Sequence, residues 1–200
     1  MKMKKLGFGL MRMPQTDPTD ASKVDIEQVK QMVDMFMAKG FKYFDTAYGY
    51  GNGASERAAK AALVDRYPRD SFYLATKLPA WAGVKTAEEA KQMFYTSLER
   101  TGAGYFDNYL LHNLGEQRTR AFDDFDMWEF VKEKKAEGKI KHYGFSFHST
   151  PEELDEYCRK ADFVFNFAGV NRPKDPEEFK KGNFGFASVL LETLKKHDNK

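Results

Sequence analysis

The sequence predicts an α/β fold of about six βα units arranged around a parallel sheet. From Leu6 to about Ala168, short apolar runs alternate with amphipathic stretches, as strands and helices do in such folds. Several apolar runs close on a polar residue, among them YFDTA, FYLATK and YFDNYLLH. Strands of (β/α)8 barrels place polar groups in this way where they open onto the catalytic face. Such a barrel usually needs roughly 250 residues, and the chain has 200. We therefore expect an incomplete or rearranged sheet derived from a (β/α)8 TIM barrel.

The expected strands are short apolar runs bounded by turn residues, at 6–13, 42–47, 72–78, 105–113, 141–147 and 162–168. Helices are expected at 25–39, 55–65, 87–101, 125–137 and 151–160, and a last helix at 186–197. Gly40, Gly102 and Gly138 directly follow three of these helices. Glycine there adopts the left-handed closing conformation without a steric penalty, so these three helix ends are the best defined.

The segment 170–185 differs from the rest of the chain. It contains NRPKDPEEFKKGN, which is rich in charge and proline, and it predicts a loop or a short helix. Its place after a sixth strand suits a βα connection in a barrel and equally a connection in an open doubly wound sheet. No seventh or eighth strand is expected.

Composition excludes several classes of partner. The 32 basic and 30 acidic side chains nearly cancel, so neither a nucleic acid nor a membrane surface is expected as a partner. No apolar run approaches the roughly 20 residues of a membrane-spanning helix. Cys158 is the single cysteine, which fits a reducing cytoplasm and leaves no internal disulfide. We expect a cytoplasmic protein without a metal site.

Asp45, Tyr50, Lys77 and His112 (the tetrad) stand at or just after the ends of three successive expected strands. The carboxyl ends of neighbouring parallel strands converge, which brings these residues together. A phenol beside a cation becomes a better proton donor, and a buried ammonium needs a counter-ion such as Asp45. With His112 to orient a carbonyl oxygen, the set suits reduction of a carbonyl with hydride from a nicotinamide.

Each member of the tetrad also has a structural interpretation. Asp45 suits a turn at a strand end, at about even odds by the turn preference of Asp. Tyr50 lies in a glycine-rich loop that could simply cover a barrel mouth. Lys77 alone would usually be a solvated strand terminus, and His112 alone a satisfied group at the edge of the core. Their joint occurrence favours the catalytic interpretation.

Residues 5–150 resemble the aldo-keto reductases, and in particular bacterial members. The resemblance rests on five motifs in order, which are KLGFGLMRMP, YFDTAYGYGNGASERAAKAAL, LATKLP, YFDNYLLHN and GKIKHYGFSFHS. It implies a (β/α)8 ancestry, NADPH or NADH as hydride donor, and catalytic roles for the tetrad. It also implies that Met11 and Arg12, and Ser146 and His148, lie beside the nicotinamide, with Ser146 the firmest of the four.

About residues 160–200 resemble a different family, the extended short-chain dehydrogenases and nucleotide-sugar epimerases. ADFVFNFAGVNRP followed by NFGFASVLLETLKK matches a strand and the start of a helix in those Rossmann-like proteins, at Asp162, Ala168, Gly169, Asn183, Gly185, Leu190 and Glu192. This fragment has neither the family's GxxGxxG loop nor its YxxxK pair. We therefore expect one α/β domain over 1–200 that joins aldo-keto-reductase-like units 1–150 to a Rossmann-like strand-helix fragment 151–200, as a natural or engineered chimera.

Two functions follow from these expectations. The first is a carbonyl reductase of the aldo-keto reductase type, acting on a small carbonyl substrate with weak or lost activity because the last strands and phosphate-binding loops are missing. The alternative is an inert chimeric scaffold that forms homodimers through its open sheet edges. A nucleotide-sugar enzyme is not expected, because one βα unit carries no complete site.

Overall fold

The computed structural model describes residues 4–159, 161 and 175–198. The chain divides into two compact units, Met1–Ser146 and Phe147–Lys200, which are described separately.

Five strands form one sheet in the order β1-β2-β3-β4-β5, and the pairs among the first four are parallel. Their bounds are β1 Gly7–Gly9, β2 Tyr43–Asp45, β3 Tyr73–Leu78, β4 Phe106–Leu114 and β5 Ile140–Phe147. Five of the six predicted strands are thus confirmed. The sixth, at 162–168, lies outside the described residues, and so does the Rossmann-like strand it would provide. β1 is much shorter than predicted, because after Gly9 the chain leaves the sheet and Gln15 bridges Val24 in an antiparallel sense.

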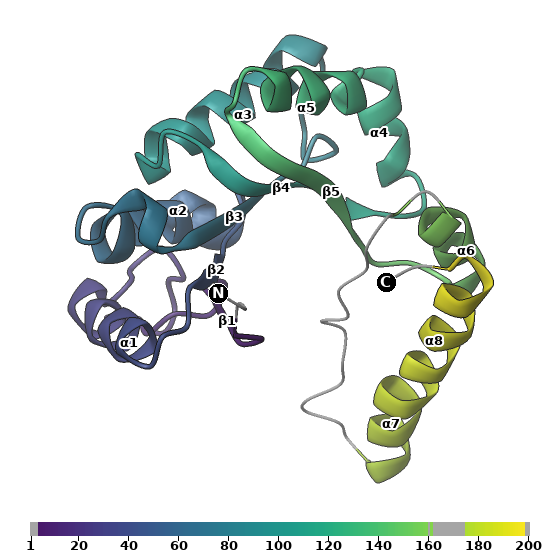
Figure 1. The fold of residues 1–200 in the computed structure, drawn as a ribbon, viewed down its shortest axis with the longest axis horizontal. Coiled ribbons are helices and arrows are strands. Elements are labelled where there is room, and N and C mark those ends of the chain that lie inside the picture. Colours follow the sequence, from purple (N-terminus) through teal and green to yellow (C-terminus); the bar gives the residue numbers. More distant parts are fainter. Residues whose placement is uncertain (1–3, 160, 162–174, 199–200) are drawn as a thin grey trace. The chain divides into compact units, whose positions relative to one another are not determined.

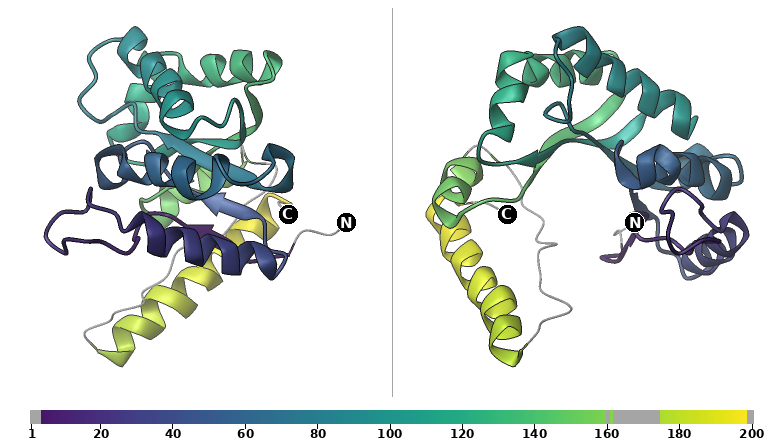
Figure 2. Two further views of the ribbon diagram at one scale, coloured as in Figure 1. Left: turned by 90° about the vertical axis from the view of Figure 1, so that its left-hand side faces the viewer. Right: turned by 180° about the vertical axis from the view of Figure 1, so that it is seen from behind.

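Helices cover the convex face of this curved sheet (Figures 1 and 2). In chain order they are α1 Ile26–Ala38, α2 Ala54–Ala59 with a π-helical continuation Lys60–Val64, α3 Ala87–Thr101, α4 Arg118–Asp124 and α5 Met127–Ala136. The side chain of Asp25 caps α1 by accepting from the amide of Gln28, and Thr86 caps α3 in the same way. Gly40, Gly102 and Gly138 have positive φ as predicted.

The predicted helix at 125–137 is shorter than expected and has a neighbour that the pattern did not reveal. Asp126 adopts a left-handed conformation with φ 53°, which an L residue rarely does and which breaks a helix. It separates α4 from α5, so the charged stretch before residue 125 forms a helix of its own.

Aromatic side chains fill the layer between the sheet and the helices. Phe44 of β2 contacts Phe36 of α1 edge to face at 5.2 Å between ring centroids. Phe94 of α3 contacts Phe106 and Tyr109 of β4 at 6.1 and 5.1 Å. These rings are buried, and each contributes apolar area to one continuous core. The core therefore lies on the convex side, and it fixes which strand residues face the helices.

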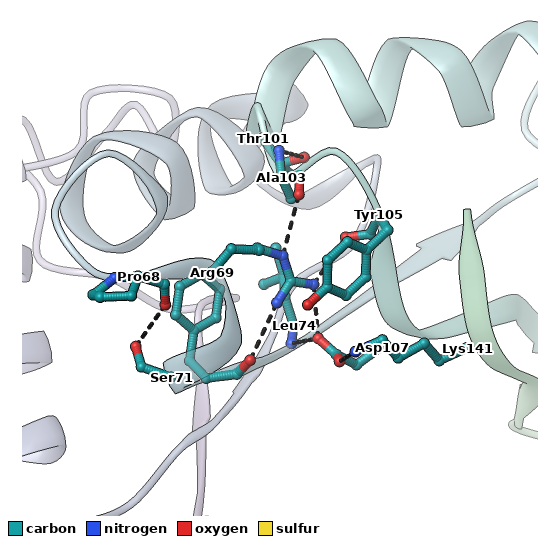
Figure 3. A network of polar contacts seen from close by, with 10 residues as sticks. Pro68, Arg69, Ser71, Leu74, Thr101, Ala103, Tyr105, Asp107 and Lys141 are labelled. Carbon is teal, nitrogen blue, oxygen red and sulfur yellow. Dashed lines mark hydrogen bonds and ion pairs between the residues drawn. The ribbon is translucent and has the colours of Figure 1, made fainter. Parts of the chain in front are cut away.

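A buried ion pair ties together the amino ends of β3 and β4 (Figure 3). Arg69 donates to Asp107 Oδ2 at 2.7 Å and to the carbonyl oxygens of Ala103 and Tyr105. The amide of Leu74 donates to the same carboxylate oxygen at 3.0 Å. The Asp107 side chain is only 3% exposed. This network stabilises the end of the sheet opposite to the tetrad.

The second unit contains α6 Pro151–Arg159, α7 Pro176–Lys180, a π-helical turn Lys181–Gly185 and α8 Phe186–Lys196. Leu154 and Cys158 of α6 pack against Leu190 of α8. Burial raises the pKa of the Cys158 thiol. The segment predicted as a loop or short helix is helical in its described part and runs directly into α8. Among the described residues, no helix is long and apolar enough to cross a membrane.

Candidate active site

The strand register places three members of the tetrad on one face of the sheet. Asp45 lies opposite Ala75, and Lys77 lies opposite Leu110. Because side chains alternate along a strand, Asp45, Lys77 and His112 all point to the same side. The alternate residues Phe44 and Tyr109 face the helices. The three polar side chains therefore lie on the concave face, at the carboxyl ends of their strands.

Lys77 and Asp45 form a close ion pair within this site. Lys77 Nζ lies 2.5 Å from Asp45 Oδ1 and donates to the backbone oxygen of Thr46 at 2.7 Å. The lysine side chain is 8% exposed and the aspartate side chain 31%. Burial raises the pKa of Asp45, and the charge of Lys77 opposes that effect. The ammonium is thus partnered on two sides, and its direction is fixed.

Tyr50 joins the pair from the turn that follows β2. It opens a short 3-10 turn, Tyr50–Gly53, in which Gly51 and Asn52 have left-handed backbones. Glycine and asparagine tolerate that conformation best. The Lys77 ammonium lies 4.8 Å from the centroid of the Tyr50 ring, and the Tyr50 and His112 rings meet edge to face at 5.7 Å. All four members of the tetrad are therefore linked by direct contacts.

Trp81 is a member of this cluster that sequence reasoning missed. Its indole Nε1 donates to the backbone oxygen of His112 at 2.7 Å, and the two rings lie 6.5 Å apart. Trp81 is 37% exposed, so part of its side chain is accessible to solvent. The available signal was its position four residues after Lys77, in the loop that follows a strand ending in the site.

The structure gives less support to the four residues predicted to lie beside the nicotinamide than to the tetrad. Ser146 Oγ accepts from the amide of Asn113 at 2.8 Å and so joins β5 to the end of β4 next to His112. Met11 and Arg12 follow β1 with exposed side chains. His148 follows β5 in the second unit and is also exposed. Their role in cofactor binding stays a prediction.

The described residues contain no group of three or more His, Cys, Asp or Glu side chains that could hold a metal ion. The tetrad supplies a phenol, an ammonium, a carboxylate and an imidazole. Such a set can hold a polar oxygen and transfer a proton to it.

The family model named "Aldo/keto reductase family" matches residues 5–178. The chain belongs to the aldo/keto reductase family. This confirms the first resemblance. The match also extends past the junction expected near residues 150–160, and the comparisons do not show a chimera.

Three similar proteins illustrate the relationship. An aldo-keto reductase of Mycobacterium sp. (strain KMS) is 30% identical over 128 residues, which are 64% of this chain and 44% of that protein. The structure of an aldo-keto reductase from Klebsiella pneumoniae in complex with NADPH has a TM-score of 0.62 at 22% identity and covers 98% of this chain and 62% of that one. A UDP-2-acetamido-2,6-beta-L-arabino-hexul-4-ose reductase of Pseudomonas aeruginosa is 43% identical over 58 residues, 29% of this chain and 16% of that protein. The chain thus spans less than half of the length of the two curated relatives.

Proposed function

We propose that this chain reduces the carbonyl group of a small substrate to an alcohol, with NADPH or NADH as the reductant. The observation that carries the proposal is the position of Tyr50, whose ring contacts both the Lys77 ammonium and the His112 ring. A proton donor, a cation and a polar ring therefore lie next to one another, as reduction of a carbonyl oxygen requires.

The residues divide the reaction between them. When bound, a nicotinamide cofactor supplies hydride to the carbonyl carbon. Tyr50 donates its hydroxyl proton to the carbonyl oxygen, and Lys77 stabilises the phenolate that remains. Asp45 keeps Lys77 charged and directed, and His112 orients the carbonyl oxygen. Each role depends on a contact already present among the side chains.

Ser146 is the best-placed residue for the nicotinamide in this proposal. Its oxygen accepts from the amide of Asn113, which leaves the hydroxyl proton free to donate to a carboxamide. Met11, Arg12 and His148 complete the proposed set. The Klebsiella pneumoniae neighbour in complex with NADPH supports a nicotinamide cofactor.

We further propose that turnover by these 200 residues on their own is weak. Hydride transfer requires the cofactor to be held to within about an ångström. The alternative is an inert scaffold that has kept the tetrad. We also propose a cytoplasmic location, in view of the single cysteine, and homodimers formed through the sheet edges.

Calorimetric titration with NADPH, followed by an aldehyde screen, tests the proposal. Saturable binding and slow aldehyde reduction are expected. Tyr50→Phe should lower kcat by about 100-fold or more, the size of a general-acid contribution, with NADPH affinity unchanged. Tyr73→Phe is the matched control, because Tyr73 is exposed and begins β3 at its far end. Absence of binding heat, or a Tyr50→Phe protein as fast as the parent, would leave the inert scaffold as the explanation.

The origin of the last forty residues is a separate proposal. We propose that they derive from a nucleotide-sugar enzyme, which is supported by the two motifs in 160–200. Replacing residues 151–200 by the corresponding segment of the Mycobacterium relative should then tighten NADPH binding at least tenfold. An unchanged dissociation constant would argue against a junction.

A further inference from the structure

Glu56 is a completely buried acid outside the tetrad, with 0% exposure. It lies on α2, and its two carboxylate oxygens contact different elements. Oε1 accepts from Thr76 Oγ1 of β3 at 2.8 Å, and Oε2 lies 3.3 Å from Arg100 Nη1 of α3. A buried carboxylate is costly unless it is paired and hydrogen-bonded. Each of these two partners connects Glu56 to a part of the chain that carries a tetrad residue.

The first connection runs through β3. Thr76 directly precedes Lys77, and because side chains alternate, Thr76 points toward α2 while Lys77 points to the concave face. The hydrogen bond from Thr76 to Glu56 thus holds β3 from the helix side of the sheet, at the residue that precedes Lys77.

The second connection runs through Arg100 to the turn that carries Tyr50. Arg100 Nη1 also donates to the backbone oxygen of Tyr48 at 3.1 Å, and its guanidinium lies 4.3 Å from the centroid of the Tyr48 ring. At the other end of the turn, a Cβ on Gly53 would lie 2.7 Å from Arg100 Cζ. Arg100 therefore contacts the chain on both sides of Tyr50.

We propose that the Glu56–Arg100 pair is a positioning device that sets Tyr50 relative to Lys77 from the helix side of the sheet. The Glu56 carboxylate is hydrogen-bonded to β3, which carries Lys77. Through Arg100 it is also linked to the turn that carries Tyr50. The pair touches neither substrate nor cofactor, so it acts only through the tetrad. The kinetic part of this inference rests on the proposed function, whereas the structural part does not.

Glu56→Gln is the main test, because it keeps an oxygen to accept from Thr76 and puts an NH2 group in place of the oxygen that faces Arg100, which removes the charge and the acceptor of that pair. Misplacement of a reacting group by about an ångström can cost about 100-fold in rate. We expect kcat to fall between tenfold and 100-fold, with the KM for the aldehyde and the affinity for NADPH changed less than threefold. Arg100→Lys, which keeps the cation, should lose less than Arg100→Met.

Asp107→Asn is the matched control. It removes the charge of another buried carboxylate that is paired with an arginine and bonded to β3, but at the opposite end of the strand. It should lower the melting temperature and leave kcat unchanged. If Asp107→Asn lowers kcat as much as Glu56→Gln does, the effect is general destabilisation and the proposal is wrong.

A second readout requires no turnover. In protein labelled with 3-fluorotyrosine, the Tyr50 resonance can be assigned by its loss in Tyr50→Phe. Glu56→Gln should shift or broaden this resonance, and Asp107→Asn should not. If the parent protein does not reduce carbonyls, the proposed function is wrong. The spectrum still tests whether Glu56 positions Tyr50. An unchanged Tyr50 resonance in folded Glu56→Gln protein would overturn this positioning role.

Discussion

At the scale of single residues, the ammonium of Lys77 dominates the electrostatics of the candidate site. It is nearly buried and is satisfied by Asp45 and by the backbone oxygen of Thr46. Asp45→Asn removes the only anion that contacts it among the described residues, because Thr46 offers only a neutral carbonyl. Loss of a hydrogen bond between charged groups costs roughly 2 kcal/mol. We expect the free energy of unfolding, measured in urea, to fall by about that amount.

Lys60 and Asp65 provide the control for this prediction. They form a lysine–aspartate pair at 2.6 Å with side chains 43% and 50% exposed. Exposed pairs are screened by water and contribute less than about 1 kcal/mol. Asp65→Asn should therefore change stability much less than Asp45→Asn, and equal losses would mean that the Asp45–Lys77 pair is effectively solvated.

The tetrad could be predicted from the sequence, whereas its supports could not. Asp45, Lys77 and His112 lie near the ends of consecutive strands, and the carboxyl ends of neighbouring parallel strands converge. The contacts of Trp81 and Glu56 could not be predicted in this way. Trp81 contacts the backbone of His112, and Glu56 meets an arginine 44 residues away on another helix. Contacts of this kind follow from helix packing and loop conformation, which leave no periodic signal.

At the scale of secondary structure, most helices could be predicted because their ends carry local chemistry. Asp25 and Thr86 cap α1 and α3, and glycine closes both. The break between α4 and α5 was missed, since it depends on a left-handed Asp126. Aspartate occurs in helices, caps and turns alike, so its presence alone does not mark a break.

The pairing of α6 with α8 should depend on pH. Asp155 of α6 accepts from Lys196 at 2.8 Å and from His197 at 2.9 Å. These hydrogen bonds, Lys196 first, hold the pKa of Asp155 below its ordinary value of 3.8. A carboxyl with a lowered folded pKa stabilises the fold above its ordinary pKa, and that contribution is lost as the pH falls through the folded value.

Amide hydrogen exchange in the full chain measures this effect. Between pH 6 and pH 3, protection of the α8 amides around Leu190 should fall more than protection of α3, after correction for intrinsic exchange rates. In Asp155→Asn, α8 should be less protected at pH 6 and show little further loss on acidification. The same pH response in parent and variant would show that another group is responsible.

At the scale of the whole molecule, the five described strands were predictable and the closure of the sheet was not. Each βα unit is specified by its own apolar periodicity, whereas closure depends on which strands meet at the edges. Among the described residues, β1 pairs only with β2, and β5 only with β4. Burial reflects this, because five of the six residues of β3 are buried but only Ile140 of β5.

Open edges of this kind favour pairing between chains, which leads to the last prediction. The amide of Leu10 donates to Asp45 of β2, so by alternation the amide of Gly9 points away from β2 and toward the free edge of β1. We expect light scattering to show a mass that rises with protein concentration toward that of a dimer. A constant monomer mass at high concentration would contradict the prediction.

Gly9→Lys identifies the edge that pairs. No atom lies within 4 Å of a Cβ at this position, so the substitution fits, and a lysine on an edge strand disfavours pairing with another chain. The variant should stay monomeric at concentrations where the parent dimerises. Gly185→Lys adds the same charge at a site in the second unit that is equally free of close contacts, and it should dimerise like the parent. Equal dissociation of both variants would mean that net charge, and not the β1 edge, controls association.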